Sequence, residues 1–360
     1  MRLAFVTNKP YSTCETFVKA QIDHLPFEIE HFWGFNLPLN IKPSDKLADR
    51  LKRRIWEKDK AKILSSEFRK RKIDVVLAHY GMMGVKVLPV CVDLSLPLVV
   101  HFHGHDAVRK SVLEEYEHFY KEMFSYSRCT VISVSHEMTK RLIKIGCPQE
   151  KIIYNVYGPN NSFFKVNPTY GNSQFIGIGR FVEKKAPHFT ILAFDKILKI
   201  HPDAKLVIAG DGGLHNSVKD LVQALDIEKN VNLPGKITPE EYKLYLQDSL
   251  AFVQHSIEAQ DGDMEGTPVA LLEAGAAGLP TISTFHAGIP DVVIHKETGL
   301  LSYEKDIEGM ADNMLWILEN KKESVQMGKN AKKRIETDFS FDKHIRQLAA
   351  ILEASANKIS

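Results

Sequence analysis

The residues best suited to chemistry stand in the segment DGDMEGTPVALLE of the second half. Glu265 and Glu273 flank Gly266, Thr267 and Pro268. Threonine is a good helix N-cap and proline fits the first turn, so we expect a helix whose N-cap is Thr267. Glu265 would then lie just before the helix and Glu273 about a turn and a half inside it. Free N–H groups at the helix start would face the same space as both carboxylates.

Two glycine-rich turns precede this segment, and each can bring backbone N–H groups to an anion at a helix N-terminus. They read GIGR, ending at Arg180, and GDGG, beginning at Gly210. Neither completes G-x-G-x-x-G, which disfavours a nicotinamide enzyme. Arg180 and Lys185 stand before a helix-like stretch, and together they could clamp a diphosphate with a planar fork and a mobile charge. Loop cations such as these are often only solvated.

The first half carries a histidine cluster, HFHGHD. His101, His103 and His105 alternate, so they would share one face of a strand, and Asp106 follows. Alternating histidines with an aspartate are metal ligands in hydrolases. A metal-dependent hydrolase using His101, His103 and Asp106 is therefore an alternative. It needs further ligands and leaves the cations and glutamates of the second half unexplained, and His101 and His105 could equally only pack or cap.

The elements that must position these groups alternate along the chain. Short β-branched apolar runs alternate with longer amphipathic stretches, which is typical of βαβ units on parallel sheets. The runs are Leu3–Thr7, Asp74–His79, Leu98–His103, Thr130–Ser135, Phe175–Gly179, Lys205–Gly210, Val231–Leu233, Ala251–Gln254 and Pro280–Ser283. Residues 157–173 are rich in Gly, Asn and Pro and form the best linker, and residues 306–354 predict helices only. We expect two Rossmann-like domains in tandem.

Composition restricts the class of protein further. With 360 residues, 44% hydrophobic and 26% charged, the chain is an ordinary globular protein. A net charge of +2 implies no polyelectrolyte partner such as nucleic acid. The N-terminal apolar run is too short for a signal peptide and no run could span a membrane. The four cysteines (Cys14, Cys91, Cys129 and Cys147) form no C-x-x-C. They favour buried thiols in a reducing compartment, so we expect a cytoplasmic protein.

The near-zero net charge hides an asymmetry between the halves. Residues 1–160 hold 25 basic and 18 acidic side chains (+7), which leaves 22 and 27 (−5) for the rest. Residues 42–72 alone hold 13 basic and 5 acidic side chains, with apolar residues near helical spacing. Such a helix could lie on an anionic membrane as a peripheral contact, or it could face the core with a solvated charged side.

The chain resembles the retaining glycosyltransferases of the GT-B fold in glycosyltransferase family 4, which includes many bacterial polysaccharide and lipid-linked sugar transferases. The matching stretches are GRFVEKKAP, HPDAKLVIAGDGG, EGTPVALLEAGAAGLP and AGIPDVVIHKETGLL, and more loosely HFHGHD and VISVSHEMTKRLIKIGCPQEKIIYNVYGPN. Ala186 is a departure, because members usually carry glycine there.

The resemblance implies an α/β fold of two Rossmann-like domains facing across a cleft. Residues 1–165 would be the acceptor-side domain and 166–340 the nucleotide-sugar domain, with helix 341–360 returning to the first domain. No metal or other cofactor is implied, because helix dipoles and cations take its place. Asp261 and Asp263, which mimic a D-x-D metal motif, are then loop residues.

Carried over by position, the resemblance also implies roles for single residues. Arg180 and Lys185 would bind the diphosphate and stabilise it as leaving group, and Glu273 would bind the ribose hydroxyls. Glu265 would meet the donor sugar. Lys236 and Ile237 would lie beside the base, and His103 would face the donor sugar from the first domain. The remaining donor-binding residues are Gly179, Gly210, Gly266, Thr267 and Pro268.

The expected reaction moves a sugar from a UDP- or GDP-sugar to a hydroxyl of a carbohydrate or lipid-linked acceptor. No nucleophilic carboxylate is obvious, so the resemblance favours front-face attack with retention. The resemblance also favours a role in surface polysaccharide or glycoconjugate synthesis, at the inner face of the membrane where the acceptor is lipid-linked. A third alternative is a protein that binds, or epimerises, a sugar nucleotide without transfer.

Overall fold

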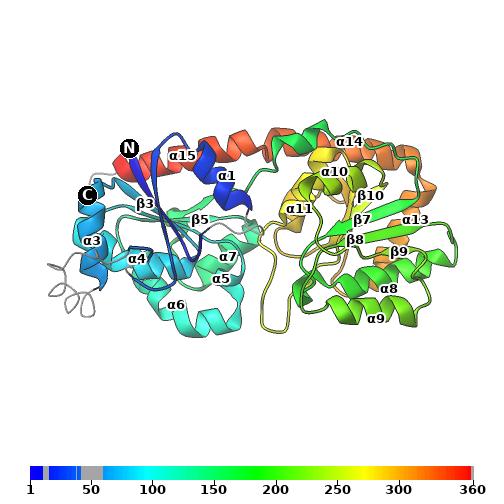
Figure 1. Cartoon of the computed structure of the whole chain (residues 1–360), viewed down its shortest axis with the longest axis horizontal. Helices are drawn as coiled ribbons and strands as arrows, with labels where there is room; N and C mark the ends of the chain where they lie inside the picture. Colours follow the sequence, from blue (N-terminus) through cyan, green and yellow to red (C-terminus); the bar gives the residue numbers. More distant parts are fainter. Residues whose placement is uncertain (11–15, 38, 42–59, 358–360) are drawn as a thin grey trace, which may run out of the picture. The chain divides into compact units, whose positions relative to one another are not determined.

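The computed structural model describes residues 1–10, 16–37, 39–41 and 60–357. The chain divides into two compact units (Figure 1). The first unit comprises residues 1–155 with 344–360, and the second comprises 156–343. Each unit is built on one six-stranded sheet, and all the strand pairs of both sheets are parallel.

The first sheet has the order β2-β1-β3-β4-β5-β6. Its strands are β1 (Arg2–Thr7), β2 (Glu28–Trp33), β3 (Val75–His79), β4 (Leu98–His101), β5 (Cys129–Ser133) and β6 (Ile152–Tyr154). The chain leaves β1 toward β2 and returns on the other side to β3, so the strand order reverses between β1 and β3. Ligands of open α/β sheets bind at the carboxyl ends of the strands beside such a switch point.

The second sheet has the order β12-β11-β10-β7-β8-β9. Its strands are β7 (Gln174–Ile178), β8 (Lys205–Ala209), β9 (Val231–Asn232), β10 (Ala251–Val253), β11 (Thr281–Thr284) and β12 (Gly299–Ser302). Numbered within the unit, this is the Rossmann order 3-2-1-4-5-6 read from one edge. Its switch point lies between β7 and β10.

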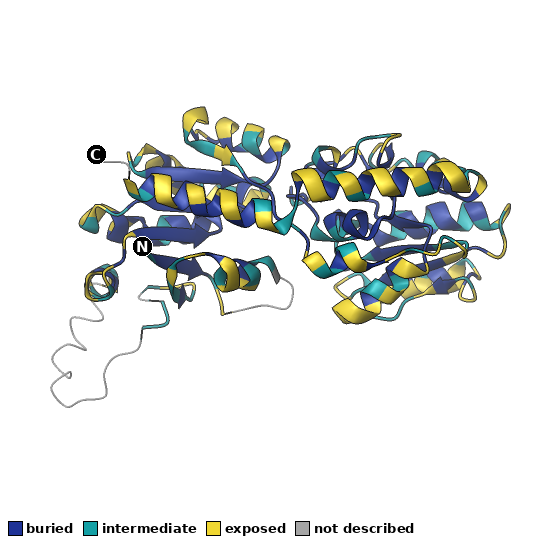
Figure 2. Cartoon of the chain, turned by 90° about the horizontal axis from the view of Figure 1, so that it is seen from above, coloured by how far each residue is buried: buried dark blue, intermediate teal, exposed yellow. Residues whose placement is uncertain are grey.

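The helices of each unit accompany its sheet. The first unit has α1 (Thr16–His24), α3 (Lys60–Arg71), α4 (Gly81–Leu94), α5 (His105–Val108), α6 (Lys110–Ser125), α7 (His136–Lys144), the 3-10 helix η2 (Gln149–Lys151) and most of α15 (Phe341–Asn357). The second has η3 (Asn161–Lys165), η4 (Glu183–Lys185), α8 (Pro187–Leu198), α9 (His215–Ala224), α10 (Pro239–Gln247), α11 (Val269–Ala277), α12 (Ile289–Val292), α13 (Ile307–Glu319) and α14 (Lys321–Asp338). In Figure 2 the central strands are buried, whereas several helices carry an exposed stripe, as amphipathic helices on a sheet should.

The nine predicted strands are all present, with small differences at their ends. Among the described residues, three strands escaped prediction: β2, β6 and β12. β2 and β6 are edge strands, and their alternating or short sequences bury only part of each strand. The prediction that residues 306–354 form only helices is confirmed by α13, α14 and α15.

The division between the units falls at 155/156, earlier than the predicted boundary at 165/166. The intervening residues pack on the second unit: Phe163 is buried against the ring of Tyr242, and Lys332 Nζ donates to the carbonyl of Phe164 at 2.7 Å. The chain re-enters the first unit at His344, against the predicted 340/341. There the His344 imidazole bonds Gln21 and Asn155.

The basic stretch 42–72 is described only from residue 60. That part is α3, whose Leu64 and Phe68 are fully buried, with Phe68 against Phe32 at 4.9 Å between ring centroids. The described portion therefore faces the core, while residues 42–59 lie outside the described residues. Cys91, Cys129 and Cys147 are buried free thiols, and Cys14 lies outside the described residues. No helix in the described ranges is long and apolar enough to cross a membrane.

Candidate active site

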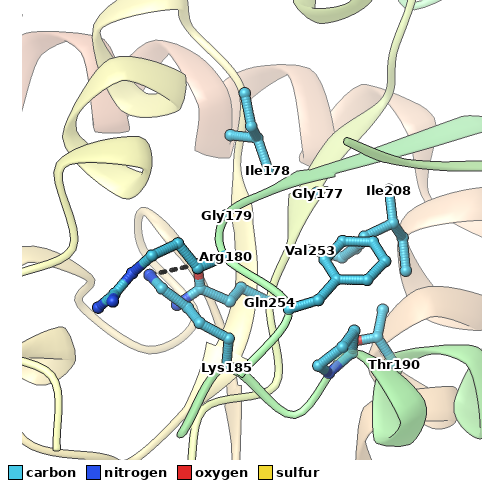
Figure 3. A pocket seen from close by; sticks show the side chains of 11 residues that line it. Gly177, Ile178, Gly179, Arg180, Lys185, Thr190, Ile208, Val253 and Gln254 are labelled. Atoms are coloured by element: carbon cyan, nitrogen blue, oxygen red, sulfur yellow. Dashed lines mark hydrogen bonds between the residues drawn. The ribbon is translucent and has the colours of Figure 1, made fainter. Parts of the chain in front are cut away.

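The candidate site of the second unit is built around the switch point between β7 and β10. A Cβ on Gly177 would lie 2.7 Å from the carbonyl oxygen of Val253, so only glycine lets these two strands approach as they do. The hollow beside the glycine turn is lined by residues including Gly179, Arg180, Lys185 and Gln254 (Figure 3). The fold therefore places two predicted cations beside the switch point.

The glycines of the two turns chiefly make room for backbone. Gly210 has a φ of 136°, and a Cβ there would lie 1.8 Å from the carbonyl oxygen of Gly179. The Gly179 N–H donates to Ala209 O at 3.0 Å and the Gly210 N–H to Gly235 O at 2.7 Å. These two N–H groups are thus used to hold the turns together. The expectation that the two turns as a whole meet an anion stays a prediction.

Arg180 and Lys185 differ in how the protein holds them. Arg180 is exposed, whereas the side chain of Lys185 is 15% exposed. Lys185 Nζ lies 2.9 Å from Glu265 Oε1 and donates to Gln254 Oε1 at 3.2 Å, the bond drawn dashed in Figure 3. The structure thus brings Lys185 and Glu265, 80 residues apart in the chain, into one buried ion pair.

The surroundings of this ion pair shift the pKa of both partners. Burial lowers the pKa of Lys185, and the neighbouring charges of Lys184 and Arg180 lower it further, against the opposing effect of Glu265. Burial would raise the pKa of Glu265, but the two lysines outweigh it and hold that pKa below its usual value. Glu265 is therefore charged at neutral pH, and Lys185 is a cation that lacks its full hydration.

Lys185 is positioned by a 3-10 turn, η4, that leads into α8. Pro187 stands at the first position of α8, as the sequence predicts for a helix that starts there. Ala186, which precedes it, has a left-handed φ of 37°. Glycine adopts this conformation without strain, which gives a physical reason for the glycine that the resemblance implies at this place.

The loop that carries Glu265 is held by a second ion pair. Lys184 Nζ lies 3.0 Å from Asp263 Oδ1 and donates to Met264 O at 2.9 Å, and both side chains are largely buried. Asp261 Oδ1 accepts the N–H of Asp263 at 2.9 Å. The two aspartates therefore serve the loop itself, and adjacent lysines tie the loop to the start of α8.

The helix after this loop starts later than predicted. α11 begins at Val269 with Pro268 as its N-cap, so the prediction of Thr267 as N-cap is wrong; Thr267 precedes it and is buried. Glu273 lies within the first two turns of α11, and burial raises its pKa to about 8. A carboxyl group held neutral in this way gains from a ligand that donates hydrogen bonds to it.

Lys236 and Ile237 follow β9. Lys236 is exposed and pairs loosely with Asp211 at 3.7 Å, and Ile237 is half-buried. Among the described residues, neither lines the hollow beside Gly179, and nor do Glu265 or Glu273. Gly266 and Pro268 are buried in the turn between Glu265 and α11.

Three contributors to the site escaped sequence reasoning: Gln254, Lys184 and His286. Gln254 contacts Lys185, Lys184 anchors the loop, and His286 accepts the backbone N–H of Glu265 at 3.2 Å. Lys184 is adjacent to a predicted cation and Gln254 ends a predicted strand, so both had a positional signal. His286 had none, because its partner is 21 residues away.

The first unit has its own cluster, at the switch point between β1 and β3. His79, at the end of β3, and His101, at the end of β4, are register partners, and His103 follows. Nitrogen atoms of the three imidazoles lie within 4.8 Å of one another. Burial lowers the pKa of His79 to about 3 and those of His101 and His103 far below normal, so all three are neutral at pH 7.

The hydrolase set His101, His103 and Asp106 is not assembled as predicted. The carboxylate of Asp106 accepts the backbone N–H groups of Gly81, His103 and Gly104 at 2.9–3.3 Å, so it organises a turn. His105 begins α5 and no longer shares a strand with the others. His79, which sequence reasoning missed, takes the place of Asp106 in the cluster, with its Nδ1 2.9 Å from His103 Nε2.

The backbone next to this cluster is strained. Tyr80 has φ 73° and ψ 140°, a combination that is nearly restricted to glycine. Its N–H donates to His101 O at 2.9 Å and its ring packs edge-on against His103 at 4.6 Å between centroids. Strain of this kind persists where the surroundings over-determine it, often beside functional groups.

Two family models match the chain. Residues 160–334 match glycosyl transferases group 1, and residues 28–155 match glycosyltransferase family 4. The matches fall on different units, the first on the unit with the Lys185–Glu265 pair and the second on the unit with the histidine cluster.

Curated relatives extend over most of the chain. The amylovoran biosynthesis glycosyltransferase AmsK of Erwinia amylovora is 34% identical over 79% of this chain and 70% of its own length. The putative colanic acid biosynthesis glycosyltransferase WcaL of Escherichia coli K12 is 31% identical over 78% of this chain and 70% of its own. Both names refer to the synthesis of polysaccharides.

The fold has solved counterparts at lower identity. The crystal structure of Anabaena Alr3699/HepE in complex with UDP-glucose matches 98% of this chain and 100% of that chain, with a TM-score of 0.77 at 16% identity. The sucrose-phosphate synthase of Thermosynechococcus elongatus matches 98% of each chain with a TM-score of 0.75, also at 16% identity. The two parallel sheets are those of the GT-B fold, and the chain belongs to glycosyltransferase family 4.

Proposed function

We propose that this glycosyltransferase moves a sugar from a UDP- or GDP-sugar to a hydroxyl of a carbohydrate or lipid-linked acceptor, with retention of the anomeric configuration. The observation that carries the proposal is the buried Lys185–Glu265 pair, with exposed Arg180 beside it, at the switch point of a Rossmann sheet. A fixed but poorly hydrated cation at this place favours an arriving diphosphate.

Arg180 and Lys185 have the chemistry that diphosphate departure requires. As the bond between the sugar and the phosphate breaks, negative charge grows on the leaving group. A cation that is already dehydrated and oriented stabilises that charge without reorganising. In the free site Glu265 balances the charge of Lys185. When the diphosphate takes over this balance, Glu265 becomes available to the donor sugar.

Other residues complete the proposed donor site. Glu273 binds the ribose hydroxyls. Burial raises the pKa of its carboxyl group to about 8, and hydrogen bonds donated by the hydroxyls would favour the ionised form. Gly266, Thr267 and Pro268 border sugar and phosphate, and Lys236 and Ile237 border the base. We also propose that His103 contacts the donor sugar. As a neutral imidazole it can accept or donate one hydrogen bond.

We expect front-face attack, in which the leaving phosphate helps to deprotonate the acceptor, and we expect the clamp to act without a metal. Support comes from the two cations beside the start of α8, which supply positive charge where a metal would otherwise stand. The hydrolase alternative is not favoured, because the carboxylate of Asp106 is occupied by three backbone N–H groups.

The experiment that tests the proposal is a screen of nucleotide sugars for slow donor hydrolysis, which needs no acceptor. Turnover of one donor names base and sugar together, and turnover that persists in EDTA supports metal independence. NMR of the anomeric centre of the transfer product then decides retention. An inverted product would refute the retaining mechanism, and hydrolysis of none of the donors would refute the donor class.

We also propose that the enzyme works at the inner face of the membrane, where residues 42–72 could contact anionic lipid. The support is compositional, because 13 basic side chains lie in this stretch against 5 acidic ones. Co-sedimentation with phosphatidylglycerol vesicles, lost in high salt and absent with phosphatidylcholine alone, is the expected result. Equal binding to both vesicles would contradict it.

A further inference from the structure

Three loops of the second unit meet behind Glu265. The first carries Glu265 itself, the second follows β11 and carries His286, and the third follows β12 and carries Glu304. His286 is 1% exposed, and its two ring nitrogens face the other two loops. Nε2 lies 3.2 Å from the Glu265 backbone nitrogen, and Nδ1 lies 2.6 Å from Glu304 Oε1.

These contacts determine the tautomer of His286. A backbone N–H can only donate, so Nε2 must be the unprotonated nitrogen that accepts it. Nδ1 then carries the hydrogen and donates it to the carboxylate of Glu304. Burial opposes the charge on Glu304, but the bonds from His286 and from the N–H of Glu258 at 2.9 Å hold its pKa below normal. Glu304 is thus an ionised, oriented acceptor.

The consequence is that Glu265 is held at both ends. Its backbone is tied to His286, and its carboxylate is paired with Lys185. Lys184 supports the same loop through Asp263 and Met264 O. Of these supports, His286 is the one bonded to the backbone of Glu265 itself, so it sets where the carboxylate emerges.

We propose that His286, oriented by Glu304, is a positioning residue that places Glu265 for the sugar-transfer step. The inference rests on the proposed function, because Glu265 has a catalytic part only if the donor sugar binds there. Misplacing a catalytic group by about 1 Å can cost ~100-fold in rate, so the loss of one anchoring bond should be measurable.

Two substitutions separate the two bonds of His286. In His286→Gln the side-chain carbonyl reaches the place of Nε2 and can still accept the Glu265 N–H, while the bond to Glu304 is lost. In His286→Asn the amide reaches the place of Nδ1 and can still donate to Glu304, while the bond to Glu265 is lost. Both variants replace the same buried ring, so each is the matched control of the other for packing.

We expect His286→Asn to lower kcat by about tenfold or more, with the KM for the donor changed less than about threefold. His286→Gln should keep kcat within about threefold of the parent, although both variants lower the melting temperature similarly. Glu304→Gln keeps an acceptor for His286, so its kcat should also stay within about threefold of that of the parent. Equal losses of kcat in the Asn and Gln variants, or no loss in either, would overturn the proposal.

A second readout does not depend on activity. Hydrogen exchange of the peptide spanning residues 263–267, followed by mass spectrometry, should be faster in His286→Asn than in His286→Gln, because the first loses the bond to the Glu265 N–H. Equal exchange in the two variants would show that His286 does not anchor this loop. If the parent turns over no donor, the proposed function fails, while the exchange measurement still tests the anchor.

Discussion

The two units place buried polar groups at the same topological position but use opposite chemistry. In the first unit, neutral imidazoles of His79, His101 and His103 occupy the carboxyl ends of the strands beside the β1/β3 switch. In the second, the cation of Lys185 and the carboxylate of Glu265 stand beside the β7/β10 switch. The parallel sheet dictates where each cluster lies, and the side chains decide what each cluster could bind.

The comparison shows two ways to keep polar groups dry. A neutral imidazole pays a small desolvation cost and exchanges hydrogen bonds with its neighbours, as His79 does with His103. A buried charge needs a partner of opposite sign, as Lys185 has in Glu265. The first cluster suits hydroxyl groups of a sugar, as proposed for His103 and the donor sugar, and the second suits an anion, as proposed for the diphosphate.

Lowering the pH should destabilise the first unit more than the second, and this is the largest effect that we expect. The folded pKa of His79 is about 3, below the unfolded value of 6.5, and those of His101 and His103 are also lowered. Between pH 6.5 and the folded pKa the unfolded chain binds protons that the folded chain does not. Each such histidine therefore removes up to about 1.4 kcal/mol of stability per pH unit as the pH falls. Hydrogen-exchange protection of the backbone amides of β3 and β4, followed as a function of pH, measures this loss of stability.

His79→Phe is the matched variant, because it keeps an aromatic ring beside Phe5, whose ring lies 4.6 Å from that of His79. His79→Phe should make the protection of the β3 and β4 amides against hydrogen exchange less dependent on pH between pH 6.5 and 4. If this pH dependence is unchanged, His79 takes up a proton as readily in the folded protein as in the unfolded chain. The contrast between a neutral and a charged cluster would then fail.

Removing either cation of the proposed diphosphate clamp should have the next largest effect on activity. Arg180→Ala and Lys185→Ala should each lower kcat/KM by ~100-fold, which corresponds to about 3 kcal/mol of transition-state stabilisation. Lys185→Ala also leaves Glu265 buried without its partner, so it should lower the melting temperature, whereas Arg180→Ala should not.

Lys196→Ala is the control for charge, since Lys196 lies in the last turn of α8 and pairs with exposed Glu308. It should leave both kcat/KM and melting temperature nearly unchanged. Near-normal turnover of both Arg180→Ala and Lys185→Ala would show that the diphosphate binds elsewhere.

Glu273 should give the smallest and most specific effect, on donor binding. Its carboxyl group is largely protonated at pH 7, because its folded pKa is about 8. If ribose hydroxyls donate to it, UDP binding favours the carboxylate and releases protons. Calorimetry in buffers of different ionisation enthalpy should detect this release, and Glu273→Gln should abolish it and weaken UDP binding more than it lowers kcat.

The same raised pKa predicts how Glu273→Gln changes stability with pH. The raised pKa of Glu273 means that the folded chain binds a proton between pH 4.5 and 8 that the unfolded chain has lost, so this group lowers stability as the pH rises through that window. Glu273→Gln should therefore be more stable than the parent at pH 8 and gain less at pH 5. The opposite trend would place Glu273 in an ion pair instead.

Much of the fold could be predicted because parallel strands that are buried on both faces appear as short apolar runs. The runs that form β1, β3 and β4 are examples, and all lie in the first sheet. Strand β2 at a sheet edge lacks that signal because polar and apolar residues mix along it, and β6 lacks it because it is only three residues long. The reach of η3 into the second unit was also not readable, because it depends on packing of Phe163 against Tyr242.

By itself, the sequence determined the fold class and the family and supplied the residue types of the proposed donor side, since these depend on local patterns such as GRFVEKKAP and EGTPVALLE. The tertiary structure alone decided which partners meet: Lys185 with Glu265, His79 with His103 in place of Asp106, and His286 between Glu265 and Glu304. The physical reason is that a sheet aligns the carboxyl ends of strands that are far apart in the chain. Side chains without any local signal therefore become neighbours.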